Sequence, residues 1–137
     1  MLVTRVEYVK QTGKKNFVIV DAAMNDLIRP AFYDSFHQII PLRKSKTKEI
    51  SSDVVGPICE SGDFFAKDRM LPKVGEGDYL ALLSAGAYGF VMASNYNSRG
   101  MAAEVLVNGN KSAIVRERQK LEEIWASERI PGWLMSH

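Results

Sequence analysis

Short segments rich in β-branched and aromatic residues recur along this chain, and turn-forming residues separate them. This pattern predicts strands joined by tight turns. The predicted strands are residues 2–11, 17–21, 39–42, 50–56, 79–84, 89–93, 103–107 and 112–116. Among the connectors, Asn108-Gly109 favours the tightest hairpin, because both residues tolerate a positive φ. We therefore expect a mainly β fold, as an antiparallel barrel or sandwich.

Two short helical segments are expected within this β pattern. Apolar residues at helical spacing predict a helix over residues 117–127, near the C-terminus. A second helical turn is predicted over residues 30–34, because proline suits the first turn of a helix. Asn25 and Asp26 supply the turn that precedes it.

Length and charge limit the classes of protein that this chain can form. A chain of 137 residues, 46% apolar and 25% charged, suffices for one domain with one modest core. Its net charge is only +2, and no basic block alternates with aromatic residues, which argues against a nucleic-acid surface. The densest basic run, residues 43–48, is interpreted as a solvated loop.

The chain contains one cysteine, which excludes an internal disulfide and a cysteine-rich zinc site. A reducing cytoplasm is the natural setting for such a chain. His37 and His137 are the two histidines, so we expect no histidine metal cluster. No apolar stretch approaches the roughly 20 residues that a membrane helix needs. Residues 1–6 resemble the start of a strand and not a signal peptide.

The cysteine lies in the segment Cys59-Glu60-Ser61-Gly62-Asp63, beside two carboxylates. Because neighbouring groups can move the pKa of a thiol, this segment suits proton transfer. A small buried core residue is the alternative for Cys59. Glu60 has an alternative too, as a turn carboxylate that accepts hydrogen bonds from backbone amides near Gly62.

A second candidate group consists of an arginine and two tyrosines. Arg29 and Tyr33 are four residues apart, so a helical turn places them on the same side. The planar arginine fork matches a carboxylate, although a surface arginine beside a half-buried tyrosine is the simpler interpretation. Tyr88 lies between Gly86 and Gly89, where the backbone can approach a ligand closely; a core tyrosine is the alternative.

Three sequence runs make the chain recognisable: DAAMNDLIRPAFY at 21–33, GPICESGD at 56–63 and GAYGFVMASNYNSR at 86–99. Between residues 3 and 131 the chain resembles the C-terminal domain of the diaminopimelate decarboxylases, a family of pyridoxal-phosphate enzymes of lysine biosynthesis. The resemblance implies that residues 1–137 form a β-barrel domain like the C-terminal domain of alanine racemase. It also implies decarboxylation of meso-2,6-diaminopimelate to L-lysine and CO2.

The resemblance assigns a role to each candidate residue. Arg29 and Tyr33 would bind the distal carboxylate of diaminopimelate, and Glu60 its distal ammonium group. Cys59 would donate a proton to the carbon that loses carbon dioxide. Tyr88 would contact both the cofactor phosphate and the substrate. This reading favours diaminopimelate over ornithine or lysine, which have no distal carboxylate.

A pyridoxal-phosphate enzyme also needs a lysine for the cofactor and a phosphate cradle. In the family these groups lie on an N-terminal (β/α)8 barrel, which we expect to be missing from this chain. The chain is then the C-terminal domain of the enzyme, inactive alone. Its partners are expected to be the barrel domain and the second subunit of a homodimer with shared active sites. The alternative is a non-catalytic regulatory or dimerisation module of the same fold.

The run 95–99 is interpreted as architectural. Gly100-Met101 follows it where many members of the family have Pro-Arg, so we expect a looser turn there.

Overall fold

The structure is a computed structural model that describes residues 1–44 and 47–135. Positions 45–46 of the basic run, and His137, lie outside the described residues. The chain divides into two compact units, Met1–Ala93 and the segment from Ser94 to the C-terminus. Each unit is described by itself below.

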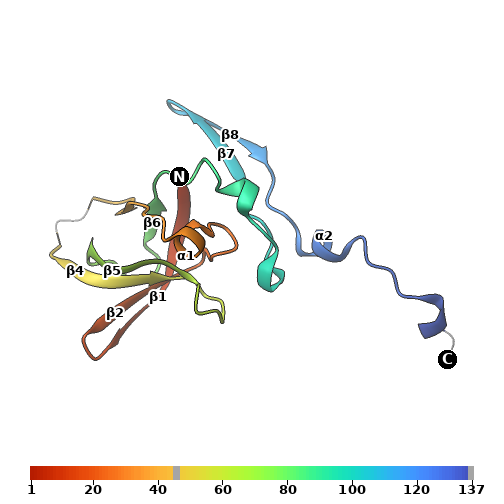
Figure 1. The fold of residues 1–137 in the computed structure, drawn as a ribbon. Helices are drawn as coiled ribbons and strands as arrows, with labels where there is room; N and C mark the ends of the chain where they lie inside the picture. The colour runs from red at the N-terminus through yellow and green to blue at the C-terminus, as the bar shows by residue number, and fades with distance from the viewer. Residues whose placement is uncertain (45–46, 136–137) are drawn as a thin grey trace. The chain divides into compact units, whose positions relative to one another are not determined.

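The first unit contains one six-stranded sheet in the order β3-β6-β1-β2-β4-β5 (Figure 1). Its strands are β1 (Leu2–Thr12), β2 (Lys15–Val20), β3 (Ile39–Pro41), β4 (Glu49–Val55), β5 (Phe64–Pro72) and β6 (Tyr79–Leu82). The long strand β1 pairs antiparallel with both β2 and β6. Because β3 at one end of this order also contacts β5 at the other, the sheet is nearly closed and barrel-like. The predicted mainly β, barrel-like fold is confirmed.

One strand pairing differs from the prediction. β2 and β4 run parallel, with Phe17 opposite Asp53, whereas every other pairing of the six strands is antiparallel. Parallel neighbours need a crossover connection. Residues 21–48 supply it, since they carry both a helix and β3 between the two strands. The sheet is therefore mixed: the predicted antiparallel arrangement is correct for most pairings and wrong for β2 with β4.

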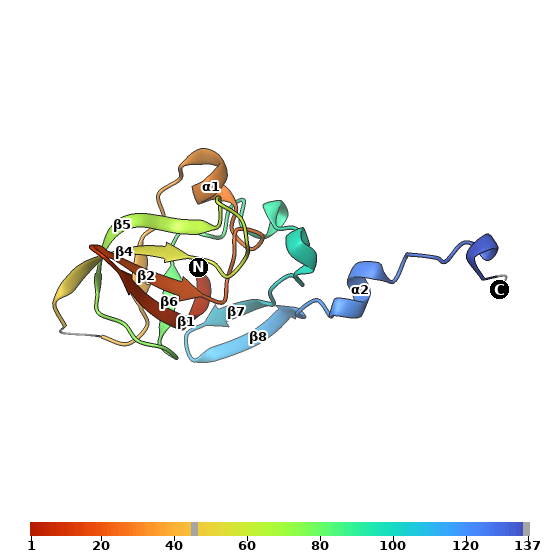
Figure 2. The ribbon, with the colours of Figure 1, turned by 90° about the horizontal axis from the view of Figure 1, so that it is seen from below.

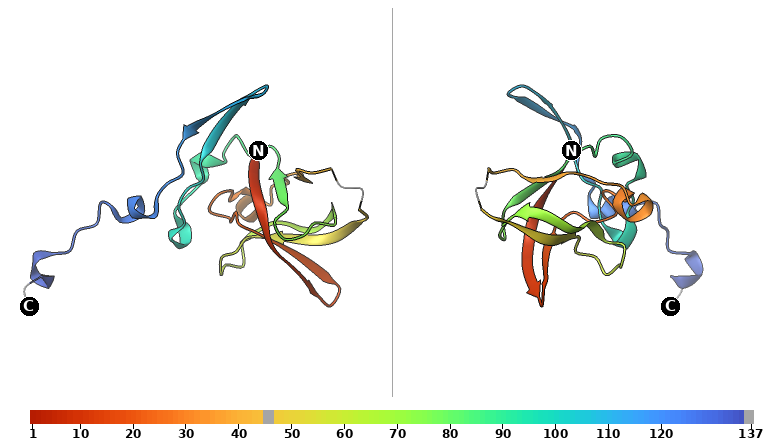
Figure 3. Two further views of the ribbon diagram at one scale, coloured as in Figure 1. Left: turned by 180° about the vertical axis from the view of Figure 1, so that it is seen from behind. Right: turned by 60° about the vertical axis from the view of Figure 1, so that its left-hand side comes forward.

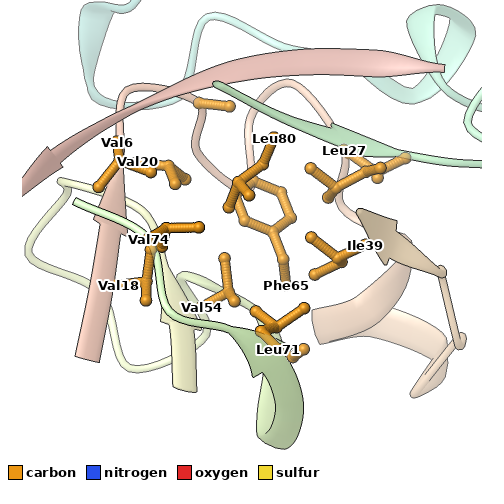
Figure 4. Packing of buried hydrophobic residues seen from close by; sticks show 13 residues of the cluster. Val6, Val18, Val20, Leu27, Ile39, Val54, Phe65, Leu71, Val74 and Leu80 are labelled. Carbon is orange, nitrogen blue, oxygen red and sulfur yellow. The ribbon is translucent and has the colours of Figure 1, made fainter. Parts of the chain in front are cut away.

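The core lies inside the curved sheet, and Phe65 of β5 is its largest fully buried side chain. Figure 4 shows Phe65 between Leu80 and Leu71, with Ile39 and Val54 close by. The other members of the cluster come from all the remaining strands and their connections: Val6, Val18, Val20, Ala22, Leu27, Ala66, Val74 and Leu82. Strands distant in sequence thus share one apolar interior.

Two predictions about strands fail. The strand β5 was missed, because the charged run Lys67-Asp68-Arg69 interrupts its apolar alternation. A bulge accommodates that run: Asp68 has φ of 49°, and its N–H donates to Asp53 Oδ1 at 2.7 Å. The strand predicted at 89–93 is instead a 3-10 helix, η1 (Phe90–Met92).

The short helix α1 (Arg29–Tyr33) confirms the predicted helical turn, with Pro30 in its first turn. The turn before it is also confirmed, since Asp26 accepts a hydrogen bond from the N–H of Ala23 at 2.9 Å. Figure 2 shows α1 beside one end of β5, which it contacts. Through this contact, the connection between β2 and β3 packs against β5 of the sheet.

The second unit begins with η2 (Tyr96–Ser98) and then forms a two-stranded hairpin of β7 (Glu104–Asn108) and β8 (Lys111–Arg116) (Figure 3). Of the turn residues, only Gly109 has a positive φ, at 60°. The predicted C-terminal helix is present but shorter than expected, as α2 (Leu121–Trp125), and η3 (Gly132–Leu134) follows it.

The run 95–99 does serve the architecture of this second unit. Asn95 Nδ2 donates to the carbonyl of Arg99 at 2.8 Å and to Gln119 Oε1 at 2.5 Å. Met101 and Gln119 exchange two further hydrogen bonds, at 3.0 and 3.1 Å. A Cβ on Gly100 would lie 2.7 Å from the carbonyl oxygen of Gln119. Gly100 therefore permits a close approach of the two segments, and the looser turn expected here stays a prediction.

Candidate functional site

A cavity of about 310 Å³ in the first unit is lined by Arg29, Tyr33, Tyr88 and Met92. Helix α1 supplies the first two residues from one side, as their spacing of four predicted. The segment after β6 supplies the other two. Three of the five predicted site residues thus meet around one cavity.

Arg29 lies half-buried at this cavity. Its Cζ atom is 5.5 Å from the centroid of the Tyr88 ring, within cation–π range. Its Nε atom is buried and has no hydrogen-bond acceptor in the described part of the chain. A buried donor without an acceptor costs about 1–3 kcal/mol. The arginine is therefore suited to a ligand that brings an anionic oxygen.

Tyr88 has a strained backbone. Its φ is 58°, a left-handed conformation that costs a residue with a side chain roughly 1–2 kcal/mol. Gly89 next to it is required, because a Cβ there would collide with the carbonyl oxygen of Ala85. Since Tyr88 is 62% exposed, it is not a core tyrosine. Strain of this kind gathers at functional sites, where the surrounding structure maintains it.

Cys59 and Glu60 lie elsewhere, on the loop between β4 and β5, and neither lines the cavity. Both are exposed, so the alternative of a buried core cysteine is wrong. Glu60 Oε1 accepts a hydrogen bond from the N–H of Gly62 at 3.1 Å. The turn contact that the sequence suggested for Glu60 is therefore present.

Asp63 is the second carboxylate of that segment, and it has a different setting. It is only 4% exposed and accepts hydrogen bonds from the backbone N–H groups of Met24, at 2.8 Å, and Ile58, at 2.9 Å. A buried carboxylate that accepts two amide hydrogen bonds organises the backbone around it. Sequence reasoning placed Asp63 beside Cys59 as a group for proton transfer and missed this contact.

Met92 was missed for a simpler reason. Residues 89–93 were predicted as a strand, in which alternate side chains point to opposite faces. The 3-10 helix η1 instead turns Met92 toward Arg29 and the two tyrosines. Met92 follows Tyr88 by four residues, a spacing that places two side chains on the same side of a helical turn. It would have identified Met92 if a helical turn had been predicted at 89–93.

A second cavity of about 440 Å³ lies elsewhere in the first unit, lined among others by Val9, Val18 and Lys73. It contains none of the predicted site residues. Across residues 1–44 and 47–135, no three histidine, cysteine, aspartate or glutamate side chains are grouped closely enough to hold a metal ion. No helix in the same residues is long and apolar enough to cross a membrane.

The fold and the cavity define a small, barrel-like β domain in which an arginine and two tyrosines line one cavity. Residues 1–86 match the family described as pyridoxal-dependent decarboxylase, C-terminal sheet domain. The chain belongs to this family, as the resemblance in the sequence predicted.

Known relatives agree with this assignment. The chain is 55% identical over 130 residues to a diaminopimelate decarboxylase of Vibrio cholerae. The matched residues make up 95% of this chain and 31% of that protein. It is also similar to the crystal structure of diaminopimelate decarboxylase from M. jannaschi, with a TM-score of 0.92 and 38% identity over 96% of the chain and 30% of that structure.

A crystal structure of the Helicobacter pylori diaminopimelate decarboxylase complexed with L-lysine is similar as well. Its TM-score is 0.83 and its identity 44%, over 91% of the chain and 30% of that structure. The chain therefore spans about a third of the length of the relatives that it matches.

Proposed function

We propose that this chain is the C-terminal substrate-binding and dimerisation domain of a diaminopimelate decarboxylase. The complete enzyme converts meso-2,6-diaminopimelate to L-lysine and CO2. The observation that carries the proposal is the cavity that gathers Arg29, Tyr33 and Tyr88 in a chain whose relatives are named diaminopimelate decarboxylase. The lone, exposed cysteine also fits a reducing cytoplasm, where we expect the enzyme to work.

Arg29 is the residue that recognises the distal carboxylate of the substrate. Its guanidinium would donate to the distal carboxylate of diaminopimelate, and the phenol of Tyr33 would donate to the same group. The buried Nε of Arg29, which has no acceptor among residues 1–44 and 47–135, supports this role, since a carboxylate would supply one. Decarboxylation removes the carboxylate of the reacting carbon, so the product lysine keeps the distal carboxylate and Arg29 would hold substrate and product by the same group.

Cys59 and Glu60 would act on the site of a second subunit. Both are exposed on a loop that does not line the cavity of Arg29, which supports a site completed by another copy of the chain. Glu60 would hold the distal ammonium group of the substrate there. Cys59 would donate a proton to the carbon that has lost carbon dioxide. The enzyme is then a homodimer with two shared sites.

Pyridoxal phosphate would be held mainly by the N-terminal barrel domain of the complete protein. The cofactor, when bound, withdraws electrons from the carbon at which the carboxylate leaves. The residues of this chain fit its neighbourhood, because Tyr88 presents an exposed phenol beside a cationic side chain. Tyr88 would contact the cofactor phosphate and the substrate. The five candidate residues are all retained, which favours a catalytic enzyme over a regulatory module of the same fold.

The replacement Arg29→Ala in the full-length enzyme tests the proposal. Loss of the charged partner should weaken substrate binding by roughly 2–5 kcal/mol, as for other buried pairs from which one partner is removed. Steady-state kinetics with meso-diaminopimelate should show this as a rise in KM. Arg5→Ala is the matched control, because Arg5 is an arginine of the same unit that pairs with Glu7 at 2.8 Å and does not line the cavity.

Unchanged kcat/KM in Arg29→Ala would show that Arg29 does not read the substrate. An equal loss in Arg5→Ala would mean that removal of any arginine disturbs the enzyme, and the substrate assignment would lose its support.

A further inference from the structure

Two separate segments of the first unit carry the proposed chemistry. The connection from β2 to α1 leads to Arg29 and Tyr33, and the loop between β4 and β5 carries Cys59 and Glu60. Strands β2 and β4 are paired, but their pairing ends at Val55, before that loop begins. Something other than the sheet must therefore fix the loop relative to the segment before α1.

The side chain of Asp63 forms that link. One carboxylate oxygen, Oδ1, accepts the N–H of Met24 at 2.8 Å, and the other, Oδ2, accepts the N–H of Ile58 at 2.9 Å. Met24 belongs to the turn before α1, whereas Ile58 directly precedes Cys59. Hydrogen bonds to an ionised acceptor are shorter and stronger than neutral ones, and burial strengthens them further.

The two segments also pack directly against each other. A Cβ added to Gly62 would lie 3.4 Å from the Met24 side chain and 3.6 Å from Ala31 of α1. On the opposite side, Gly56 leaves no room, because a Cβ there would collide with the Asp63 carboxylate. The N–H of Gly56 closes the base of the loop by donating to the Asp63 carbonyl at 3.0 Å. The space around Asp63 thus fits an aspartate closely.

Glu60, the other carboxylate of the loop, makes a local contact. Its Oε1 accepts the N–H of Gly62, two residues away in the same loop. A hydrogen bond of this range shapes the loop itself. Asp63 is buried and reaches a segment 39 residues away in the sequence.

We propose that Asp63 is a positioning residue that holds the Cys59–Glu60 loop against the turn before α1. Each proposed active site has two half-sites: Arg29 and Tyr33 of one subunit, and Cys59 and Glu60 of the other. Within one chain, Asp63 joins the half-site of Arg29 to the half-site that serves the second subunit. The roles of Cys59, Glu60 and Arg29 in this inference rest on the proposed function. The hydrogen bonds and the packing of Asp63 do not.

The replacement Asp63→Asn in the full-length enzyme tests the inference, because asparagine keeps the shape but sets an amide N–H against one of the two backbone N–H donors. A misplaced catalytic group costs on the order of 10²-fold in rate, so we expect a fall in kcat of that size. KM should rise as well, because Glu60, the proposed partner of the distal ammonium group, lies on the same loop, although α1 still presents Arg29. Asp78→Asn is the matched control, because Asp78 also accepts a backbone N–H, from Gly75 at 2.8 Å, but in the turn before β6. It should keep normal kinetics.

Subunit mixing shows which half-site Asp63 controls. Mixed with Arg29→Ala subunits, Asp63→Asn subunits should regain activity, because one site of the mixed dimer has both halves intact. Mixed with Cys59→Ala subunits, they should stay inactive, because both variants damage the same half. Provided that Arg29→Ala and Cys59→Ala subunits restore activity to each other, three results would overturn the inference: the opposite pattern, recovery in both mixtures, or recovery in neither. So would an unchanged kcat in Asp63→Asn.

Hydrogen exchange gives a measurement that does not depend on activity. The amides of Met24 and Ile58 should exchange faster in Asp63→Asn than in the unmodified enzyme, as measured on peptides that cover residues 22–26 and 56–60. Equal exchange would overturn the inference. Mixing Arg29→Ala with Cys59→Ala subunits is the control for the proposed function: if that mixture stays inactive, the shared dimer is wrong, and exchange together with kcat decides the role of Asp63.

Discussion

At the scale of single residues, the candidate site combines a strained backbone with a buried hydrogen-bond donor. Tyr88 has a left-handed backbone, and Arg29 has a buried Nε with no acceptor in the part of the chain that the structure describes. Each feature costs free energy in the isolated domain, and a bound anion would offset only the second. Both features fit the proposed site, in which the donors would be oriented before a ligand binds.

The single cysteine gives the first prediction at this scale. In the full-length enzyme, Cys59→Ala should lower kcat by about 10²-fold or more, the usual contribution of a general acid, and leave KM nearly unchanged. Steady-state kinetics with meso-diaminopimelate would measure both. A rise in KM without a fall in kcat would mean that Cys59 binds substrate and does not deliver a proton.

At the scale of elements, the pairing of β4 with β5 depends on a polar bulge. Asp53 accepts the N–H of Asp68 through one oxygen and the Lys15 ammonium, at 2.9 Å, through the other. Burial by itself raises the pKa of Asp53, but the hydrogen bonds from Asp68 and Lys15 outweigh burial and lower this pKa below 3.8. The bulge thus explains how a strand with three charged residues in its middle stays in the sheet.

This bulge predicts a pH dependence of stability. A carboxyl with a lowered pKa in the folded state stabilises it above the unfolded pKa, and this stabilisation is lost as pH falls through the folded value. The free energy of unfolding should therefore fall more steeply below pH 3.8 in the unmodified protein than in Asp53→Asn. Urea unfolding at a series of pH values would measure both slopes.

Glu76→Gln is the control for that measurement, because Glu76 is an exposed carboxylate in the connection between β5 and β6. Its slope should match that of the unmodified protein. Identical slopes for Asp53→Asn and the unmodified protein would contradict the role given to Asp53.

At the scale of the whole molecule, the two units differ in how they are stabilised. The first unit has a continuous core, whereas none of the described residues of the second unit is buried. Large apolar side chains are exposed along β7, β8 and the C-terminal segment: Val105, Leu106, Val107, Ile114, Val115, Trp125, Ile130, Trp133, Leu134 and Met135. A two-stranded hairpin is marginally stable in water on its own. The second unit therefore needs another surface for stability.

We predict that the 137-residue chain self-associates through this exposed apolar surface. Sedimentation velocity at micromolar concentrations should show a dimer or larger species. The double variant Val105→Lys/Ile114→Glu should associate less, because charge replaces apolar surface, while opposite charges on directly paired residues preserve the hairpin. A clean monomer of the unmodified chain at high micromolar concentration would contradict this prediction.

What the sequence alone determined is local. The alternation of apolar residues located most strands, Gly109 marked a turn that does need a positive φ, and the spacing of Arg29 and Tyr33 placed them on one side of a helical turn. Each of these follows from the geometry of a few consecutive residues. The long sequence runs also identified the family, since chance seldom preserves so many residues in order.

Tertiary structure alone decided the rest, because each remaining feature depends on segments that meet only after folding. The parallel pairing of β2 with β4 depends on the path of a long crossover, and the strand β5 persists because Asp53 and Lys15 satisfy its charged bulge. Asp63 acquires its role only when burial brings it to the N–H of Met24. Hydrogen bonds between distant segments leave no periodic signal in the sequence, and the closed core alone brings their partners together.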